Sequence, residues 1–179
     1  DLSNDLLPKR SGETSTQVIT ARQRGTVIHL LLEGLAGLEI AHYEITAREF
    51  LTHYPDLEAE HDQIIAEVMK LLAKPDLQML FGPQSRAEVP IGGRVLMPGG
   101  DHQLFSGRID RYVEMPEAIL IADYKTTRHP PSADDPIDAD IAVQLEIYRK
   151  LVSAAYPGKE VRCAIVWTAG PHYRLVTTE

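Results

Sequence analysis

The sequence predicts an α/β fold in which a central mixed β-sheet is flanked by helices, with a helical N-terminal part. Two observations carry this prediction. Apolar residues recur with the period of a helix over residues 17–74, and short strand-like patterns bounded by Gly and Pro follow over residues 86–124. One further helical pattern and two more strand patterns come after these, an order typical of a sheet with helices packed on it.

Helices are expected in the first half of the chain, after a polar N-terminal arm. Residues 1–14 are polar and contain Pro and Gly, a composition typical of a linker. Beyond this arm, apolar residues recur every three to four positions, and the last of these stretches stops before Pro75. The helices are expected at about 17–36, 45–51 and 57–74, with a short helical turn at about 77–81.

Strand patterns dominate the second half of the chain. The turns between the first four strands are short, so we expect an antiparallel meander. Residues 15–179 are expected to form one domain, mostly helical over 15–82, with a sheet core and one long helix over 84–179. The expected strands cover about 86–91, 94–97, 103–114, 118–124, 161–168 and 173–177, with turns at Gly92-Gly93, Pro98-Gly99-Gly100 and Met115-Pro116-Glu117, a proline-rich acidic loop at 126–140 and a helix at about 140–155.

The charge and length of the chain limit its function. The 179 residues carry a formal net charge of −8, which argues against non-specific binding of nucleic acids, because that binding usually leaves a basic footprint. A metal-dependent hydrolase needs carboxylates, whose charge the metal offsets locally; alternatively, other parts of a larger protein supply the basic residues. The chain begins at Asp1 rather than Met, and we expect it to be a piece of a longer protein.

The single cysteine excludes several kinds of site. Cys163 lies in an apolar stretch, where a buried core thiol is expected. One cysteine cannot form a disulfide within the chain or ligate zinc or an iron–sulfur cluster with other cysteines, and it favours an intracellular protein. No apolar stretch reaches the roughly 18 residues of a membrane span. The sequence also lacks the Gly-Lys-Ser/Thr loop of a nucleotide site, so no ATP site is expected in this chain.

Acids and a lysine in the strand region are the first candidates for a site. Asp110 lies in an alternating pattern, and Asp123 and Lys125 end an apolar strand pattern. Side chains alternate faces along a strand, so Asp123 and Lys125 should point to one side of the sheet. Two carboxylates and an ammonium can hold a divalent metal and a phosphate oxygen, as phosphodiester hydrolysis requires. Alternatively, Asp110 and the nearby Glu88 lie on a solvent-exposed face of the sheet. Asp123 and Lys125 would then form a simple ion pair.

Polar residues on the predicted helices supply further candidates. His29 lies four residues after Gly25 and four before Glu33, so the three share one helix face. A neutral imidazole is a common metal ligand, and the glycine would let this turn approach the sheet; a surface or core histidine and a simple kink are the alternatives. Gln144 and Tyr148 share a face of the last helix and are suited to binding a phosphate, with an ordinary amphipathic boundary as the alternative.

In chain order these residues form four motifs: Gly25-Thr26-Val27-Ile28-His29, Gly107-Arg108-Ile109-Asp110-Arg111, Asp123-Tyr124-Lys125-Thr126 and Gln144-Leu145-Glu146-Ile147-Tyr148. The series resembles the RecB-type nucleases of the PD-(D/E)XK superfamily, which implies a restriction-endonuclease-like core. Four further segments look most like the C-terminal nuclease domain of AddA, the helicase–nuclease subunit of AddAB: Leu80-Phe81-Gly82-Pro83, Glu88-Val89-Pro90, Tyr156-Pro157-Gly158 and Val166-Trp167-Thr168. The iron–sulfur relatives AddB and Cas4 use a cysteine cluster that this chain lacks.

The resemblance implies a role for each candidate residue. Mg²⁺, for which Mn²⁺ can substitute, would be bound by His29, Asp110, Asp123 and the backbone carbonyl of Tyr124. Lys125 would position the attacking water and stabilise the charge that develops on the phosphate. Gln144 and Tyr148 would orient the nucleophile or grip the DNA backbone, and Glu88 and Glu33 would be accessory acids.

The resemblance also implies an activity and partners. The expected reaction is Mg²⁺-dependent, exonuclease-type hydrolysis of DNA in a helicase–nuclease that acts in double-strand break repair and recombination. The expected partners are a helicase region of the same polypeptide and an AddB-type subunit, in the bacterial cytoplasm and without membrane association. The alternative is a module of the same fold that binds metal and DNA ends without cleavage; a docking domain whose acids are merely solvated is a more distant one.

Overall fold

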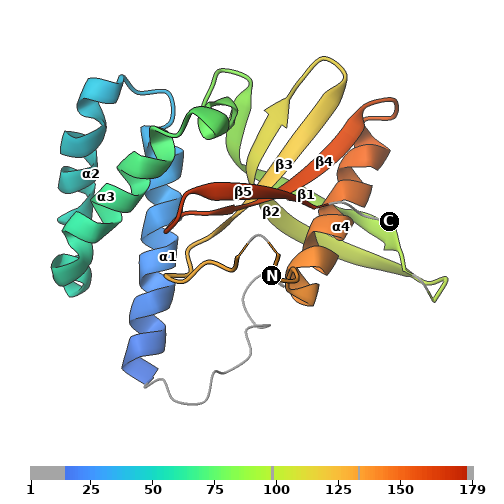
Figure 1. Cartoon of the computed structure of the whole chain (residues 1–179). Coiled ribbons are helices and arrows are strands. Elements are labelled where there is room, and N and C mark those ends of the chain that lie inside the picture. The colour runs from blue at the N-terminus through green and yellow to red at the C-terminus, as the bar shows by residue number, and fades with distance from the viewer. Residues whose placement is uncertain (1–14, 98, 133, 177–179) are drawn as a thin grey trace.

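The computed structural model describes residues 15–97, 99–132 and 134–176, with side chains described from Thr20 onward. The predicted linker over 1–14 therefore lies outside the described residues, as does Pro98 of one predicted turn. Helices come first and the sheet second, as Figure 1 shows. The elements are α1 (Ser15–Leu35), η2 (Ile40–His42), α2 (Tyr43–Leu51), η3 (Pro55–Glu60), α3 (His61–Leu72), η4 (Pro75–Leu80), β1 (Ser85–Leu96), β2 (His102–Glu114), β3 (Ala118–Lys125), α4 (Ala139–Ala155), β4 (Glu160–Trp167) and β5 (His172–Val176).

The sheet has five strands in the order β1-β2-β3-β4-β5. The first three pair antiparallel, which confirms the predicted meander. The chain then crosses over through α4, so β4 lies parallel to β3, and β5 pairs antiparallel with β4 at the edge. A parallel neighbour requires such a crossover, because a tight turn can only join antiparallel strands. The predicted mixed sheet with a helical N-terminal part is confirmed.

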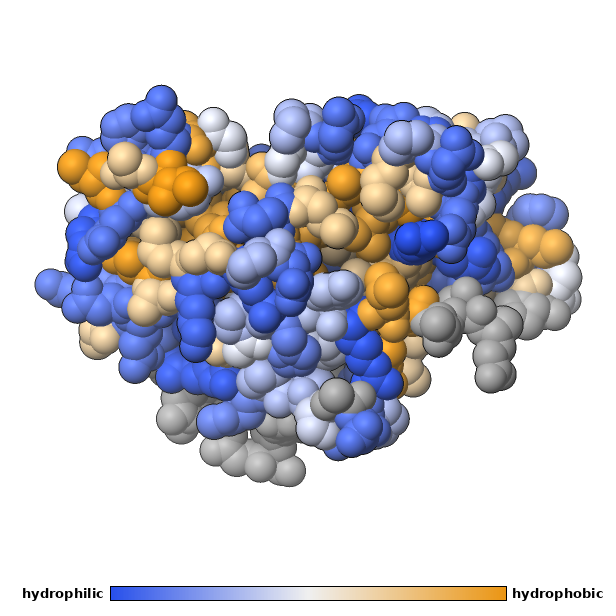
Figure 2. Space-filling view, turned by 45° about the horizontal axis from the view of Figure 1, so that its top comes forward, coloured by the Kyte–Doolittle hydropathy of each residue, from blue (hydrophilic) through white to orange (hydrophobic). Residues whose placement is uncertain are grey.

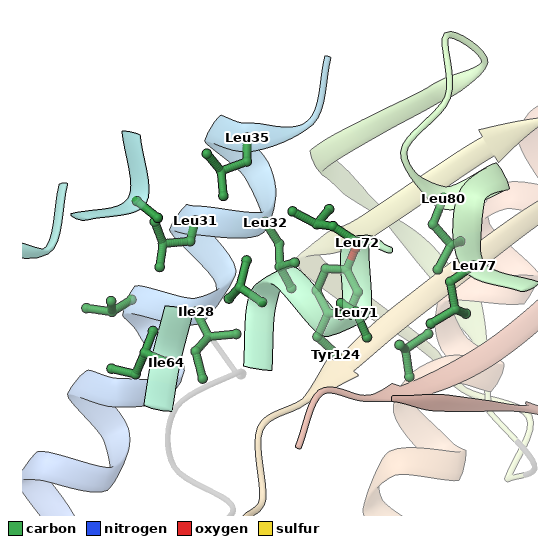
Figure 3. Packing of buried hydrophobic residues seen from close by; sticks show 14 of the residues in the cluster. Ile28, Leu31, Leu32, Leu35, Ile64, Leu71, Leu72, Leu77, Leu80 and Tyr124 are labelled. Carbon is green, nitrogen blue, oxygen red and sulfur yellow. The ribbon is translucent and has the colours of Figure 1, made fainter. Parts of the chain in front are cut away.

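Two hydrophobic cores lie on opposite faces of the sheet. One core joins α1, α2 and α3 to one face, and Figure 3 shows Ile28, Leu32 and Leu71 packed beside Tyr124 of β3. The other lies under α4, where Leu145 packs with residues of the opposite face. Because helices cover both faces, β3 is buried along almost its whole length, which explains its continuous apolar sequence.

Two predicted element boundaries were wrong. The pair Gly92-Gly93 was expected to form a turn, but it lies inside the continuous strand β1. A Cβ atom on Gly93 would lie 2.8 Å from Leu151 Cδ2 of α4, so this glycine allows the helix to approach the strand. The helix expected over 57–74 is divided into η3 and α3, and the His61 ring at the junction lies 3.0 Å from the backbone oxygen of Tyr54.

Polar residues cover most of the face in Figure 2, with apolar residues gathered in smaller areas between them. Several large apolar side chains are exposed on the surface of the molecule, including Ile40, Ile45 and Leu104. In the described part of the chain, none of the helices combines the length and apolar character needed to cross a membrane.

Candidate active site

Three carboxylates line up across three neighbouring strands. In the β1–β2 ladder, Ala87 pairs with Arg111 and Val89 with Ile109, which places Glu88 opposite Asp110. In the β2–β3 ladder, Arg111 pairs with Ala122, and one further step of this register brings Asp110 beside Asp123. Residues opposite each other on neighbouring strands lie close together. The register therefore gathers three acids, one from each strand.

Strands β1 and β2 are distorted where their acids lie. Glu88 has a φ of 51°, in the left-handed region that non-glycine residues rarely adopt. On β2, Ile109 and Tyr112 both belong to the core under α4, although strict alternation would put residues three apart on opposite faces. The alternation is therefore interrupted around Asp110. This irregularity leaves the Asp110 carboxylate within reach of both α1 and the end of β3.

Helix α1 brings His29 to the acids. Its Nδ1 lies 3.6 Å from Asp110 Oδ1, and its ring contacts the Tyr124 ring edge-on at 5.5 Å between centroids. The helix approaches the sheet closely one turn earlier, where a Cβ on Gly25 would lie 2.9 Å from Thr126 Oγ1. The close approach expected from Gly25 is thus confirmed.

One ligand atom each from His29, Glu88 and Asp110 lie within 4.8 Å of one another, a spacing at which a metal ion could bridge them. The group found among the described residues does not include Asp123, whose carboxylate lies 2.7 Å from the Lys125 ammonium. Glu88 was expected only as an accessory acid, but it lies in one close group with His29 and Asp110. Its unusual φ is the local signal, and a sequence pattern does not reveal it.

Asp123 and Lys125 point to the same side of β3, as the strand period predicts. The Lys125 Nζ lies 2.7 Å from Asp123 Oδ2, although that oxygen is buried and makes no well-aligned hydrogen bond. The neighbouring Tyr124 N–H donates a 2.7 Å hydrogen bond to Asp110 Oδ2. The end of β3 thus holds both carboxylates, one through its backbone and one through its lysine.

Burial makes the charged forms of Asp110, Glu88 and His29 less favourable. Burial, and then the charge of Asp123, raise the pKa of Asp110 well above its ordinary value. Burial and the nearby Glu33 raise the pKa of Glu88. Burial lowers the pKa of His29, although Asp123 acts in the opposite direction. Buried carboxylates in such a group disfavour their own charged forms, so a bound cation would relieve their repulsion.

The donor set fits a divalent metal ion. The carboxylate oxygens of Glu88 and Asp110 and the imidazole of His29 are hard or borderline ligands, the types that suit Mg²⁺ and Mn²⁺. The lowered pKa of His29 keeps its imidazole neutral near pH 7, as ligation requires. The Asp123 Oδ2 atom is buried and already lies 2.7 Å from the Lys125 ammonium.

Gln144 and Tyr148 lie next to each other on one face of α4. The Gln144 amide lies 3.3 Å from the Tyr148 hydroxyl, which confirms that the two share a face. Tyr148 packs against β2 at Gly107, where a Cβ would collide with its hydroxyl oxygen. The pair therefore contacts the strand three residues before Asp110 and hydrogen-bonds internally, rather than joining the group of acids.

Glu33 lies near Glu88 but is not part of the close group of His29, Glu88 and Asp110. It is exposed and lines a cavity of about 420 Å³ together with Phe81 and Arg111. Arg111 is buried, and its guanidinium donates to the Leu32 carbonyl and, at 3.1 Å, to the Tyr124 hydroxyl. This arginine ties α1 to the site strands, and its place in the Gly107–Arg111 motif was the only signal of it in the sequence.

Comparisons with known proteins agree with this architecture. A family model described as the PD-(D/E)XK nuclease superfamily matches residues 5–174. The chain is 32% identical over 166 residues to an ATP-dependent helicase/nuclease subunit of Moorella thermoacetica, in an alignment that covers 79% of this chain and 11% of that protein. The chain thus spans about a tenth of the length of this relative.

A solved structure, described as the crystal structure of SSO0001, superposes on 90% of this chain and 79% of its own, with a TM-score of 0.40 and 15% sequence identity. The family match is one of sequence, and it covers nearly the whole chain, including the three site strands and α4. The chain belongs to the PD-(D/E)XK nuclease superfamily.

Proposed function

We propose that this chain is a divalent-metal-dependent deoxyribonuclease domain that hydrolyses phosphodiester bonds of DNA in an exonuclease-type reaction. The observation that best supports the proposal is the close group of His29, Glu88 and Asp110. Asp123 lies beside Asp110 on the next strand, and its carboxylate lies 2.7 Å from the Lys125 ammonium. The cluster combines buried acids, a neutral imidazole and one ammonium, and the superfamily of the chain is one of nucleases.

The metal would be held by His29, Asp110, Asp123 and the backbone carbonyl of Tyr124, with Glu88 as a further ligand because it lies in the same close group. Bound Mg²⁺, or Mn²⁺ in its place, would supply an acidified water and polarise the scissile phosphate. The residues of the chain provide the ligand geometry, and the hydrogen bond from Tyr124 N–H fixes the orientation of the Asp110 carboxylate.

Lys125 is proposed to act on the reacting phosphate. Its ammonium would donate hydrogen bonds to the attacking water or to the phosphate oxygens, where negative charge increases in the transition state. The contact with Asp123 holds the ammonium at the site before substrate arrives. Gln144 and Tyr148 would bind the DNA backbone on the α4 side, and Glu33 would line the path beside the cavity.

The similarity to a helicase/nuclease subunit supports a proposal about the biological context. We propose that residues 15–179 act as one nuclease domain of a longer helicase–nuclease, with an AddB-type partner subunit, in double-strand break repair and recombination in the bacterial cytoplasm. A helicase region in the same polypeptide would deliver DNA to the site. This would compensate for the net charge of −8, which does not favour DNA binding by this part alone.

Cleavage of end-labelled DNA with Mg²⁺ tests the proposed function directly. Asp123→Ala and Lys125→Ala should each lower the cleavage rate at least about 100-fold, because each removes a ligand or a charge stabiliser from the transition state. Asp62→Ala and Lys74→Ala are matched controls, since both residues form ion pairs remote from the site and should cut like the wild type. Variants at Asp123 and Lys125 that cut normally would refute the mechanism, and DNA binding with no cleavage by the wild type would favour the silent module.

A further inference from the structure

A network of charges surrounds the buried Arg24, five residues before His29 on α1. The arginine is only 5% exposed. Its Nε lies 3.1 Å from a Glu60 oxygen, and its Nη2 donates to Glu67. Arg128 also pairs with Glu60, at 2.7 Å. Two arginines thus face two glutamates, so the formal charges of the network balance and none of them is left buried alone.

The network reaches the end of β3, where the proposed catalytic lysine lies. Arg24 Nη1 donates a 3.2 Å hydrogen bond to the carbonyl of Thr126, the residue that follows Lys125. Glu67 also accepts a hydrogen bond from the hydroxyl of Thr168, which is fully buried. The backbone N–H of Thr168 in turn donates to the carbonyl of Lys125 at 3.0 Å. Both carbonyls at the end of β3 are therefore tied to the network, directly or through Thr168.

None of these groups belongs to the group of acids that would bind metal. Apolar side chains would pack α1 and α3 together without the cost of desolvating the charges of Arg24, Glu60 and Glu67. A guanidinium, by contrast, fixes directions, because its planar donors match carboxylates and carbonyls at set angles. The network thus favours a role in holding a defined backbone position over a role in general stability.

We propose that Arg24, together with Glu67 and Thr168, forms a positioning unit that fixes the backbone of Lys125 and Thr126 and so keeps the Lys125 ammonium in place beside Asp123. The inference rests on the proposed function, because it requires Lys125 to act in the reaction. Lysine has a long and flexible side chain. A fixed backbone position limits the distances that its ammonium can take from the reacting phosphate. The unit is expected to affect the rate of the chemical step more than the binding of DNA.

Kinetics of Arg24→Lys and Thr168→Val test this inference. Lysine keeps the charge of Arg24 but loses its several fixed donors, and valine keeps the shape of Thr168 but loses the hydroxyl that donates to Glu67. Arg24→Lys should lower the single-turnover cleavage rate roughly 10- to 100-fold, since a small misplacement of a catalytic group costs about that much. KM for DNA should stay near that of the wild type. The matched control is Arg48→Lys, which changes an exposed arginine with two acidic partners.

A double-mutant cycle with Lys125→Ala separates positioning from general structure. If Arg24 acts through Lys125, adding Arg24→Lys to Lys125→Ala should leave the residual cleavage rate unchanged. An equal loss in both backgrounds would overturn the inference, as would a normal rate in both Arg24→Lys and Thr168→Val. If circular dichroism shows that Arg24→Lys is not folded, the cleavage rate of Thr168→Val alone tests the inference. If Lys125→Ala cuts normally, the proposed function fails; if only the Arg24 and Thr168 variants cut normally, the positioning unit alone fails.

Discussion

Single residues at the site are held by backbone contacts as much as by their side chains. Asp110 is oriented by the Tyr124 N–H, and a larger residue at Gly107 would displace the Tyr148 hydroxyl. An added methyl group in such a tightly packed place typically costs about 1–3 kcal/mol. The two motifs that contain Gly107 and Tyr148 therefore depend on each other in space, although about 40 residues separate them in the chain.

Cys163 provides a residue-scale prediction about pH. Burial raises the pKa of its thiol to about 12, and its Sγ lies 3.6 Å from the Leu145 carbonyl. A raised pKa keeps the thiol protonated, so on the order of one molecule in ten thousand carries the thiolate at pH 8. We expect iodoacetamide to leave the native protein unmodified at pH 8, by intact mass. The same protein in guanidinium should gain one adduct, and rapid labelling of the native protein would contradict the burial of Cys163.

At the scale of elements, α1 carries the site on one side and the core on the other. His29 faces Asp110, while Ile28 and Leu32 are fully buried against α3 and the sheet (Figure 3). Residues three and four apart share a helix face, so the apolar stripe fixes the rotation of α1 and with it the direction of the histidine. Loss of packing in the stripe should therefore disturb both stability and the site.

Leu32→Ala tests this connection. Removing a fully buried leucine should lower the free energy of unfolding by about 2–5 kcal/mol, as the lost burial and the remaining cavity add up. The control, Leu30→Ala, changes a neighbour that is 37% exposed and should cost under about 1 kcal/mol. Urea titration followed by circular dichroism measures both variants. Equal losses in the two variants would mean that α1 does not depend on this stripe.

The sequence predicts those parts of the site that follow a regular period. The period of two correctly places Asp123 and Lys125 on one side of β3, and the helical period places Gln144 with Tyr148. It fails where packing between distant segments decides the local structure. The pair Gly92-Gly93 is typical of a turn, but it lies inside β1. The absence of a side chain at Gly93 leaves room for Leu151 of α4.

The same limit applies to Glu88 and Arg24. No spacing in the sequence shows that Glu88 takes a left-handed backbone conformation opposite Asp110. Arg24 resembles any other basic residue on a helix, since its partners Glu60 and Glu67 come from segments about 40 residues away. Only the assembled helices and sheet bring these residues together.

On the scale of the whole molecule, the site lies where the N-terminal helices meet the sheet (Figure 1). Of the proposed ligands, His29 comes from α1 and the acids from the β1–β3 meander, so folding joins two parts of the chain that are about 80 residues apart. The contact between the N-terminal helices and the sheet brings together buried acids, whose mutual repulsion opposes folding. A cation bound there would favour the folded state, because only the assembled site holds all of its ligands.

The last prediction concerns this balance between stability and function. Asp110→Asn removes one buried charge beside Asp123 and Glu88 but keeps an oxygen that can accept the Tyr124 N–H. Without metal, the variant should be more stable by about 1 kcal/mol, or roughly 2–4 °C in Tm for a chain of this size. Mg²⁺ at about 100 times its Kd should stabilise the wild type by about 2.7 kcal/mol and the variant much less.

Thermal unfolding in EDTA and in a series of Mg²⁺ concentrations measures both effects. Asp62→Asn is the matched control, because that carboxylate is exposed and pairs with Arg48 far from the acids, so its Mg²⁺ response should equal that of the wild type. A variant at Asp110 that is less stable in EDTA would show that the carboxylate is favourably paired without metal. An undiminished rise in Tm with Mg²⁺ would show that the ion binds elsewhere. The expected pair of results, higher stability in EDTA and a weaker response to Mg²⁺, would occur only if the acids repel one another and Asp110 binds the ion.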